Sequence, residues 1–195
     1  FWDMRAAMNF IMGGLGSGTV VMAYFLSLFV AFDDQALINI NIGAGVIISI
    51  GLFFVWLKIG RKLRAPFSIL RPQTSWMSRE IYAVGIFFIG LAADFWNPSP
   101  IFHGVTALGA AAFLYCQGRI LHSGKGIPTW RVAQMPMMLV ATGLLEGIAL
   151  LTLIFSQWGD QLPSVAPSPP LAILLILFNV YLWRRYVSNA KEWEI

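Results

Sequence analysis

Residues 7–32 read AMNFIMGGLGSGTVVMAYFLSLFVAF, and this run decides the fold class because it contains no charged side chain. A helix needs about 20 mainly apolar residues to cross the hydrocarbon core of a bilayer. A buried helix of a soluble domain is usually shorter and has a polar face. The run therefore predicts a transmembrane helix close to the start of the sequence.

Five more apolar runs follow, separated by short polar or proline-rich connections, at about 37–59, 81–96, 101–121, 135–156 and 171–186. The third is short for a span, and it can be extended back through Trp76. Prolines mark the connections because they interrupt helix interiors. The pattern predicts an all-α integral membrane protein in which residues 1–195 form one bundle of about six transmembrane helices.

The overall composition agrees with this assignment. Of the 195 residues, 58% are hydrophobic and 11% are charged, and the mean hydropathy is +0.72. A soluble domain carries about 25% charged residues, so a polar globular surface cannot be built from this chain. The net charge of +4 would suggest nucleic acid in a soluble protein. Here the basic residues are better interpreted as topology signals, and no nucleic-acid partner is expected.

Every basic residue falls on one side of the predicted membrane. They are Arg5, Lys58, Arg61, Lys62, Arg64, Arg71, Arg79, Arg119, Lys125, Arg131, Arg184, Arg185 and Lys191. The opposite connections carry Asp33, Asp34, Asp94 and Asp160 and no basic residue. Because loops rich in Lys and Arg stay in the cytoplasm, both termini are predicted to be cytoplasmic. We expect a multi-pass protein of the inner membrane of a bacterium or archaeon.

Two features inside the spans are candidates for packing or function. Gly14 and Gly18 form a small-xxx-small pair, which favours a close helix contact. Glu146 is the only carboxylate deep within a span, where an ionisable group is costly and often functional. It is a proton-pathway candidate, and a protonated or hydrogen-bonded structural residue is the equal alternative.

Histidine and cysteine usage limits the cofactors that this chain can hold. His103 and His122 stand at opposite ends of one predicted span, roughly 28 Å apart along a helix, so they cannot ligate the same haem iron. We interpret His103 as structural. Cys116 is the only cysteine, which excludes an internal disulfide or a cysteine-ligated iron–sulfur cluster. No haem, cluster or other metal site is expected in this chain.

The connections on the basic side carry the sequence features that say most about function. Residues 58–80 mix basic side chains with aromatic residues and prolines, and residues 118–134 repeat that combination. Such loops can obey the positive-inside rule, bind anionic lipid or dock an acidic soluble partner.

Both connections carry a resemblance to the membrane-anchor subunits of the dimethyl sulfoxide and polysulfide reductase type. That family has a Gly, an Arg-Ala pair and a Ser-x-x-Ser-x-Glu pattern, which stand here at Gly60, Arg64, Ala65, Ser75, Ser78 and Glu80. Its Val/Ile-Pro-Thr-Trp stretch and later Pro stand at Ile127, Pro128, Thr129, Trp130 and Pro136. Residues 2–18, WDMRAAMNFIMGGLGSG, resemble the membrane subunit of phenylacetyl-CoA:acceptor oxidoreductase.

The resemblance implies an anchor that is not catalytic on its own. It would pass electrons between an iron–sulfur subunit, docked on the basic face by residues 58–80 and 118–134, and membrane quinone (menaquinone or ubiquinone). A catalytic subunit with a molybdenum or tungsten pterin would lie beyond the iron–sulfur subunit. Family members often have eight helices and a His at the place of Lys58, so this chain departs from the pattern twice.

The resemblance and the basic face together select the expected quinone-binding residues. They are Lys58, Arg64, Trp76, Arg79, Glu80, Tyr82, His122 and Trp130. Quinone chemistry needs groups that accept or release protons, so we expect Glu80 to act together with Lys58 or His122.

Three alternatives compete with this interpretation. Basic docking loops in the cytoplasm favour a complex that faces the cytoplasm, as a coenzyme A thioester oxidoreductase would; the alternative within the family is an outward-facing dimethyl sulfoxide or polysulfide reductase. A second alternative is a small secondary transporter that uses Glu146. A lipid-modifying enzyme is a weaker third, because the sequence has no paired His/Asp cluster or activated nucleophile.

Overall fold

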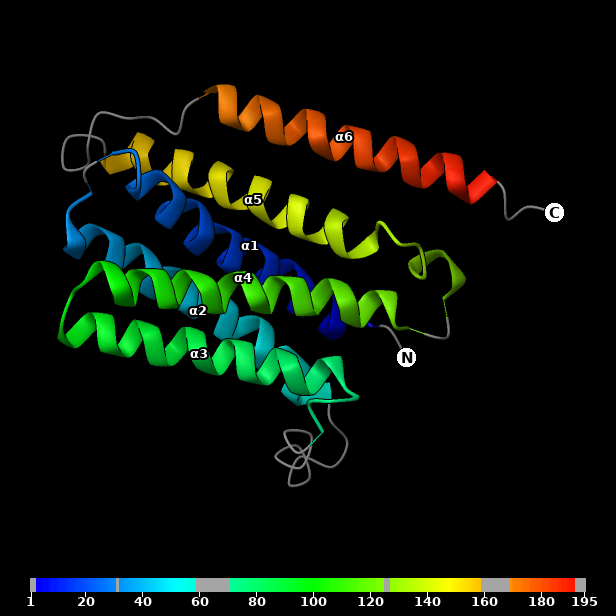
Figure 1. The fold of residues 1–195 in the computed structure, drawn as a ribbon, viewed down its shortest axis with the longest axis horizontal. Coiled ribbons are helices and arrows are strands. Elements are labelled where there is room, and N and C mark those ends of the chain that lie inside the picture. The colour runs from blue at the N-terminus through cyan, green and yellow to red at the C-terminus, as the bar shows by residue number, and fades with distance from the viewer. Residues whose placement is uncertain (1–2, 31, 59–70, 125–126, 159–168, 192–195) are drawn as a thin grey trace.

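The computed structural model describes residues 3–30, 32–58, 71–124, 127–158 and 169–191. Within this part of the chain there are six long α-helices, one short 3-10 helix and no strand (Figure 1). They are α1 (Met4–Ser27), α2 (Asp34–Lys58), α3 (Trp76–Trp96), α4 (Pro100–His122), η2 (Pro128–Trp130), α5 (Met135–Trp158) and α6 (Pro169–Lys191). All six α-helices are long and apolar enough to cross a membrane, which confirms the predicted all-α membrane fold.

The six helices run alternately in opposite directions along the long axis of the molecule (Figure 1). One end, called the basic end below, gathers the starts of α1, α3 and α5 and the ends of α2, α4 and α6. Its described basic residues include Arg5, Lys58, Arg79, Arg119, Arg131, Arg184 and Arg185. The other end, called the acidic end, carries Asp33, Asp34 and Asp94. The charge separation along the sequence is therefore also a separation in space.

Some helices begin or end at other residues than the apolar runs do, because local hydrogen bonds set the helix ends. The helix predicted over residues 7–32 begins at Met4, after the N-cap Asp3, and ends at Ser27. Beyond it, the backbone N–H of Val30 bonds back to Leu26 in a turn, although the sequence there is still apolar. Hydropathy measures preference for lipid and does not encode where a helix stops.

The start of α3 is decided by a side chain. The hydroxyl of Ser75 accepts a hydrogen bond from the backbone N–H of Ser78 at 3.4 Å, which caps the helix at Trp76. α3 thus begins five residues before the apolar run at 81–96. This extra turn carries Trp76, Arg79 and Glu80 into the bundle.

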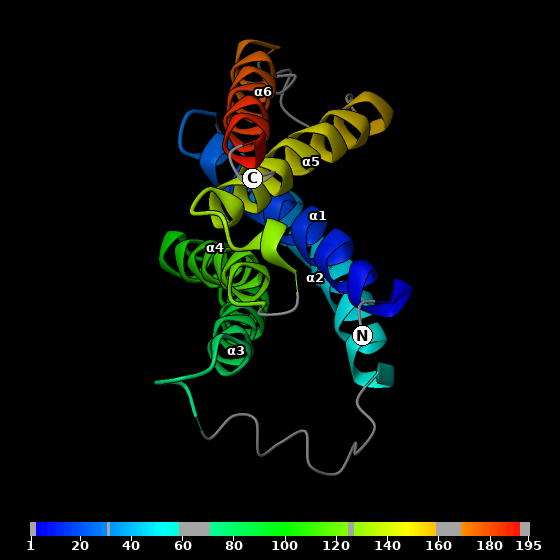
Figure 2. The same cartoon turned by 90° about the vertical axis from the view of Figure 1, so that its right-hand side faces the viewer.

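Helix α1 packs against α2, α4 and α5, so it forms the centre of the bundle (Figure 2). Its glycines make this possible. A Cβ atom at Gly18 would lie 1.7 Å from the backbone oxygen of Gly143, and a Cβ atom at Gly147 would lie 2.2 Å from the carbonyl carbon of Gly18. The close helix contact predicted from Gly14 and Gly18 is therefore made with α5.

Two buried apolar clusters flank α1. One joins it to α2, α3 and α4 around Phe87 and Phe113, and the other joins it to α2 and α5 around Leu37 and Leu151. Helix α6 lies outermost and packs on α5, where the Asn179 side chain donates to the backbone oxygen of Ala141 at 3.1 Å. Most side chains of α6 are exposed, as expected of a helix that faces lipid or another subunit.

Candidate functional site

The polar centre of the basic end is the buried carboxyl group of Glu80. It lies one turn into α3 and is 8% exposed. The Asn9 side chain of α1 donates a hydrogen bond to Glu80 Oε1 at 3.4 Å. Gln117 of α4 is a second hydrogen-bonding neighbour of this carboxyl. Three helices thus converge on one ionisable group.

Gln117 connects α4 to α1 as well. Its Nε2 atom donates to the backbone oxygen of Asn9 at 3.1 Å, and its side chain is fully buried. The contact requires a glycine opposite it, because a Cβ atom at Gly13 would lie 2.2 Å from Gln117 Nε2. Gly13 therefore leaves the space through which Gln117 reaches the Glu80 region.

A cation–aromatic stack stands beside this cluster. The guanidinium of Arg79 lies 4.1 Å from the ring centre of Trp76, and that of Arg119 lies 4.7 Å from the same ring. Tyr115 packs edge-on against Trp76 at 6.0 Å. Arg79 also donates to the backbone oxygens of Pro72 and Gln73, at 2.7 and 2.9 Å. These contacts hold two positive charges close to the entry of α3.

Several buried polar atoms at the basic end have no partner within the part of the chain that the structure describes. They are Asn9 Oδ1, Gln117 Oε1 and Arg119 Nε. A buried donor or acceptor without a partner costs about 1–3 kcal/mol, so such atoms are rare unless water or a ligand satisfies them. The cluster offers one donor and two acceptors in a region that already holds a carboxyl group.

The structure brings only some of the predicted site residues together. Trp76, Arg79 and Glu80 lie together on the first turns of α3, in the cluster just described. Tyr82, on the same helix, is 48% exposed. The last residue of α4 is His122, and Trp130 ends η2; both are only partly buried at the basic end. The predicted residue Arg64 lies outside the described residues.

Lys58, which the sequence placed beside Glu80, forms an ion pair with the carboxylate of Asp3. Its Nζ atom lies 3.5 Å from Oδ1 of Asp3, the N-cap of α1, which also pairs with Arg5 at 3.1 Å. Desolvation alone would raise the pKa of Asp3, but the Ala6 backbone hydrogen bond and the Lys58 and Arg5 charges hold that pKa below its usual value. The pairing of Lys58 with Glu80 stays a prediction.

Glu146 lies in the seam between α5 and α1, where it faces Gly14, the residue next to the Gly13 that faces Gln117. A Cβ atom at Gly14 would be 3.3 Å from Glu146 Oε2, so the carboxyl group lies against the α1 backbone. The side chain is only partly buried. Its role in a proton pathway stays a prediction.

Sequence reasoning did not assign a site role to Asn9, Gln117 or Arg119. Asn9 and Gln117 are isolated polar residues within otherwise apolar runs, which is the signal that could have pointed to them. Arg119 was interpreted only as a topology charge. What joins these residues to Glu80 is the packing of α1 and α4 against α3, which no local pattern encodes.

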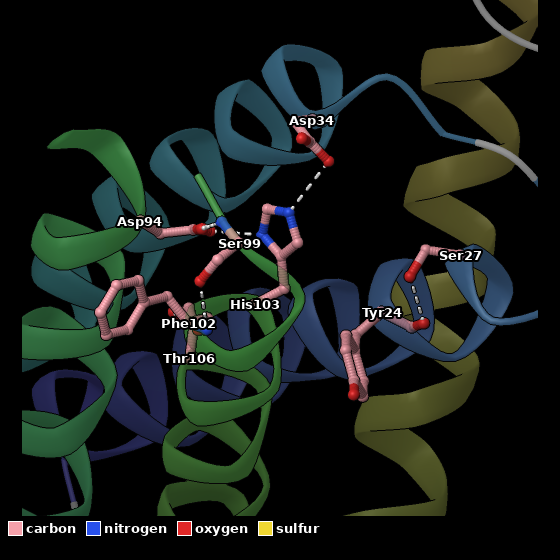
Figure 3. A network of polar contacts seen from close by, with 8 residues as sticks. All are labelled: Tyr24, Ser27, Asp34, Asp94, Ser99, Phe102, His103 and Thr106. Carbon is pink, nitrogen blue, oxygen red and sulfur yellow. Dashed lines mark hydrogen bonds and ion pairs between the residues drawn. The ribbon is translucent and has the colours of Figure 1, made fainter. Parts of the chain in front are cut away.

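A second polar cluster occupies the acidic end and is centred on His103 of α4 (Figure 3). Its Nδ1 atom lies 2.5 Å from Oδ2 of Asp94 on α3, and its Nε2 atom lies 3.2 Å from Oδ1 of Asp34 on α2. Asp94 is fully buried, whereas the Asp34 side chain is 62% exposed. One imidazole therefore cross-links three helices, which is the structural role expected of His103.

Replacing His103 by Ala is expected to lower the free energy of unfolding by about 3–5 kcal/mol, because the fully buried Asp94 carboxyl would lose its imidazole partner and keep only the Ser99 backbone N–H. The matched variant Asp34→Asn removes the exposed partner and should cost about 1 kcal/mol or less. Thermal unfolding of the purified protein in detergent measures both. Equal losses in the two variants would contradict the cross-link assigned to the His103–Asp94 pair.

Residues 4–184 match a family model described as DMSO reductase anchor subunit (DmsC). No curated protein sequence matches the chain. The matched region runs from the first residue of α1 into the last turns of α6, so it includes both polar clusters.

Proposed function

Because the chain belongs to the DMSO reductase anchor subunit (DmsC) family, we propose that it binds membrane quinone and connects it electronically to an iron–sulfur subunit. Membership already implies a membrane anchor that associates with iron–sulfur and molybdenum-containing catalytic subunits. The proposal adds the quinone, its binding site and the orientation of the complex.

The observation that carries the proposal is the buried Glu80 carboxyl, with an unpaired oxygen on each of its neighbours Asn9 and Gln117 and an unpaired Arg119 Nε over Trp76. Oxidised quinones present carbonyl acceptors and reduced quinones present hydroxyl donors. Arg119 Nε is an unpaired donor for a carbonyl, and Asn9 Oδ1 and Gln117 Oε1 are unpaired acceptors for a hydroxyl. The residues present thus fit the polar head of a quinone in either redox state.

The bound quinone would supply the two-electron chemistry, and the chain would supply binding and proton handling. Glu80 holds or releases a proton at its carboxyl oxygens, and Asn9 and Gln117 orient this carboxyl group by hydrogen bonds. Arg79 and Arg119 add positive charge near the head group, and Trp76 gives it an aromatic wall. Lys58, Arg64, Tyr82, His122 and Trp130 would border the site.

The basic end is also the proposed docking face for the iron–sulfur subunit, through residues 58–80 and 118–134. A quinone site next to this face keeps the distance to the nearest cluster short. The distribution of Lys and Arg supports cytoplasmic termini in an inner membrane. It therefore favours a cytoplasmic catalytic subunit, as in phenylacetyl-CoA:acceptor oxidoreductase, over the outward-facing arrangement.

Purification from native membranes in mild detergent tests this function. We expect the chain to co-purify with an iron–sulfur subunit and a molybdenum- or tungsten-containing subunit, with quinone recovered by solvent extraction. Protease treatment of sealed inverted vesicles should degrade the partners if they face the cytoplasm. A chain that purifies alone, without iron, molybdenum or tungsten, would contradict the proposal.

A further inference from the structure

A groove of about 530 Å³ lies at the other end of the bundle, away from the Glu80 cluster. Helix α2 and the preceding Asp33 supply most of its lining, Leu150 and Ile154 of α5 line it from the other side, and α1 contributes Thr19. Gln35, Asn39 and Gly43 are exposed, so the groove opens to the surroundings of the bundle along α2. Its volume is in the range of small-molecule sites.

The lining changes from polar to apolar along the groove. Asp33, Gln35 and Asn39 lie at the acidic end, and Gln35 Nε2 donates to Asn39 Oδ1 at 3.1 Å. From Ile40 inward the lining is apolar except for Thr19, whose hydroxyl donates to the backbone oxygen of Leu15 at 2.7 Å. The deep part therefore has no side-chain donor to offer a polar ligand.

The length of the groove matches one leaflet of a bilayer. From Gln35 to Ile47 the α2 backbone rises about 18 Å at 1.5 Å per residue. Half of a hydrocarbon core is about 15 Å. A chain-like ligand that enters at Asp33 would thus reach the region of the bilayer midplane.

The polar mouth of the groove is acidic. Asp34 is paired with His103, while Asp33 is exposed and has no ion pair among the described residues. The chain's Lys and Arg residues all belong to the opposite end in sequence. An anionic head group would be repelled here, and a head group with an ammonium would find a carboxylate.

We propose that this groove binds one acyl chain of an amine-bearing phospholipid, of the phosphatidylethanolamine type, with its ammonium against Asp33. The apolar lining takes the acyl chain, and the Gln35 and Asn39 amides supply hydrogen bonds to the ester region. The site is independent of the quinone site at the basic end. An isoprenoid quinone tail in the groove is the competing occupant.

Gly43 offers a way to fill the groove without disturbing the fold. It lines the groove, and a Cβ atom placed on it meets nothing within 4 Å. Gly43→Leu should therefore occupy the space of the acyl chain. Gly85 of α3 does not line the groove and has the same open surroundings, so Gly85→Leu is the matched control.

The test is native mass spectrometry and lipid extraction of the intact complex after exchange into equimolar phosphatidylethanolamine and phosphatidylglycerol. The wild-type complex and Gly85→Leu should retain phosphatidylethanolamine, and Gly43→Leu should retain about tenfold less, a change equivalent to 1.4 kcal/mol of binding. Asp33→Asn should keep the groove but lower the preference for phosphatidylethanolamine by about two- to fivefold, as for an exposed ion pair.

Three outcomes would overturn the proposal: no preference between the two lipids in the wild-type complex, unchanged lipid retention in Gly43→Leu, or loss of bound quinone instead of phospholipid in Gly43→Leu. Turnover with quinone is measured in parallel in every variant. A wild-type complex that retains phosphatidylethanolamine but shows no turnover with quinone would count against the quinone proposal at the basic end and leave the lipid site standing.

Discussion

Glu80→Gln is expected to lower quinone-dependent turnover of the complex by about 10²–10⁴-fold, the usual contribution of a proton-transferring side chain. Gln has nearly the same shape and still accepts the hydrogen bond that Asn9 donates to Glu80 Oε1. It cannot hold or release a proton in the relevant range. Assembly should therefore survive while proton handling fails.

The measurement compares the rate with a soluble quinol or quinone analogue and the iron content of the purified complex. Glu146→Gln is the informative comparison, because the Glu146 carboxyl group also lies against α1 from a spanning helix. Loss of turnover in Glu80→Gln alone would place proton handling at the basic end. Loss in Glu146→Gln alone would refute the role of Glu80 and favour a path along the α1–α5 seam.

Gly18→Ala is expected to destabilise the folded bundle by about 3 kcal/mol or more and to remove most of the assembled protein from the membrane. The added Cβ atom would stand 1.7 Å from the backbone oxygen of Gly143. A flexible side chain could turn away, but a backbone atom moves only if α1 and α5 separate. The separation would also disturb Gly147, whose Cβ position lies 2.2 Å from the Gly18 carbonyl carbon.

Yield and thermal unfolding in detergent measure this loss, with Gly85→Ala as the matched control. Gly85 is also a helical glycine, and its Cβ position is free of neighbours within 4 Å. Ala is favoured over Gly in a helix by about 1 kcal/mol, so the control should unfold at the same temperature or slightly higher. If Gly18→Ala behaves like Gly85→Ala, the α1–α5 contact is not what holds the bundle together.

Part of the candidate site was predictable from sequence. Trp76, Arg79 and Glu80 could be selected because they share one short stretch that combines a helix start, basic charge and a family motif. Asn9, Gln117 and Arg119 could not be joined to them. Their contacts with the stretch cross from α1 and α4 to α3, and single polar residues in apolar runs do not reveal which helix they face.

The sequence by itself determined the fold class, the number of spans and the separation of charge between the two ends. These properties follow from local hydropathy and from the sign of the loop charges, which each segment carries independently of its neighbours. The tertiary structure alone decided that Gly18 meets Gly143, that Gln117 crosses to Asn9 and that His103 joins Asp34 to Asp94. Such contacts depend on which helices pack together and at what rotation, because packing inside a membrane is selected by shape and hydrogen bonding rather than by hydrophobicity.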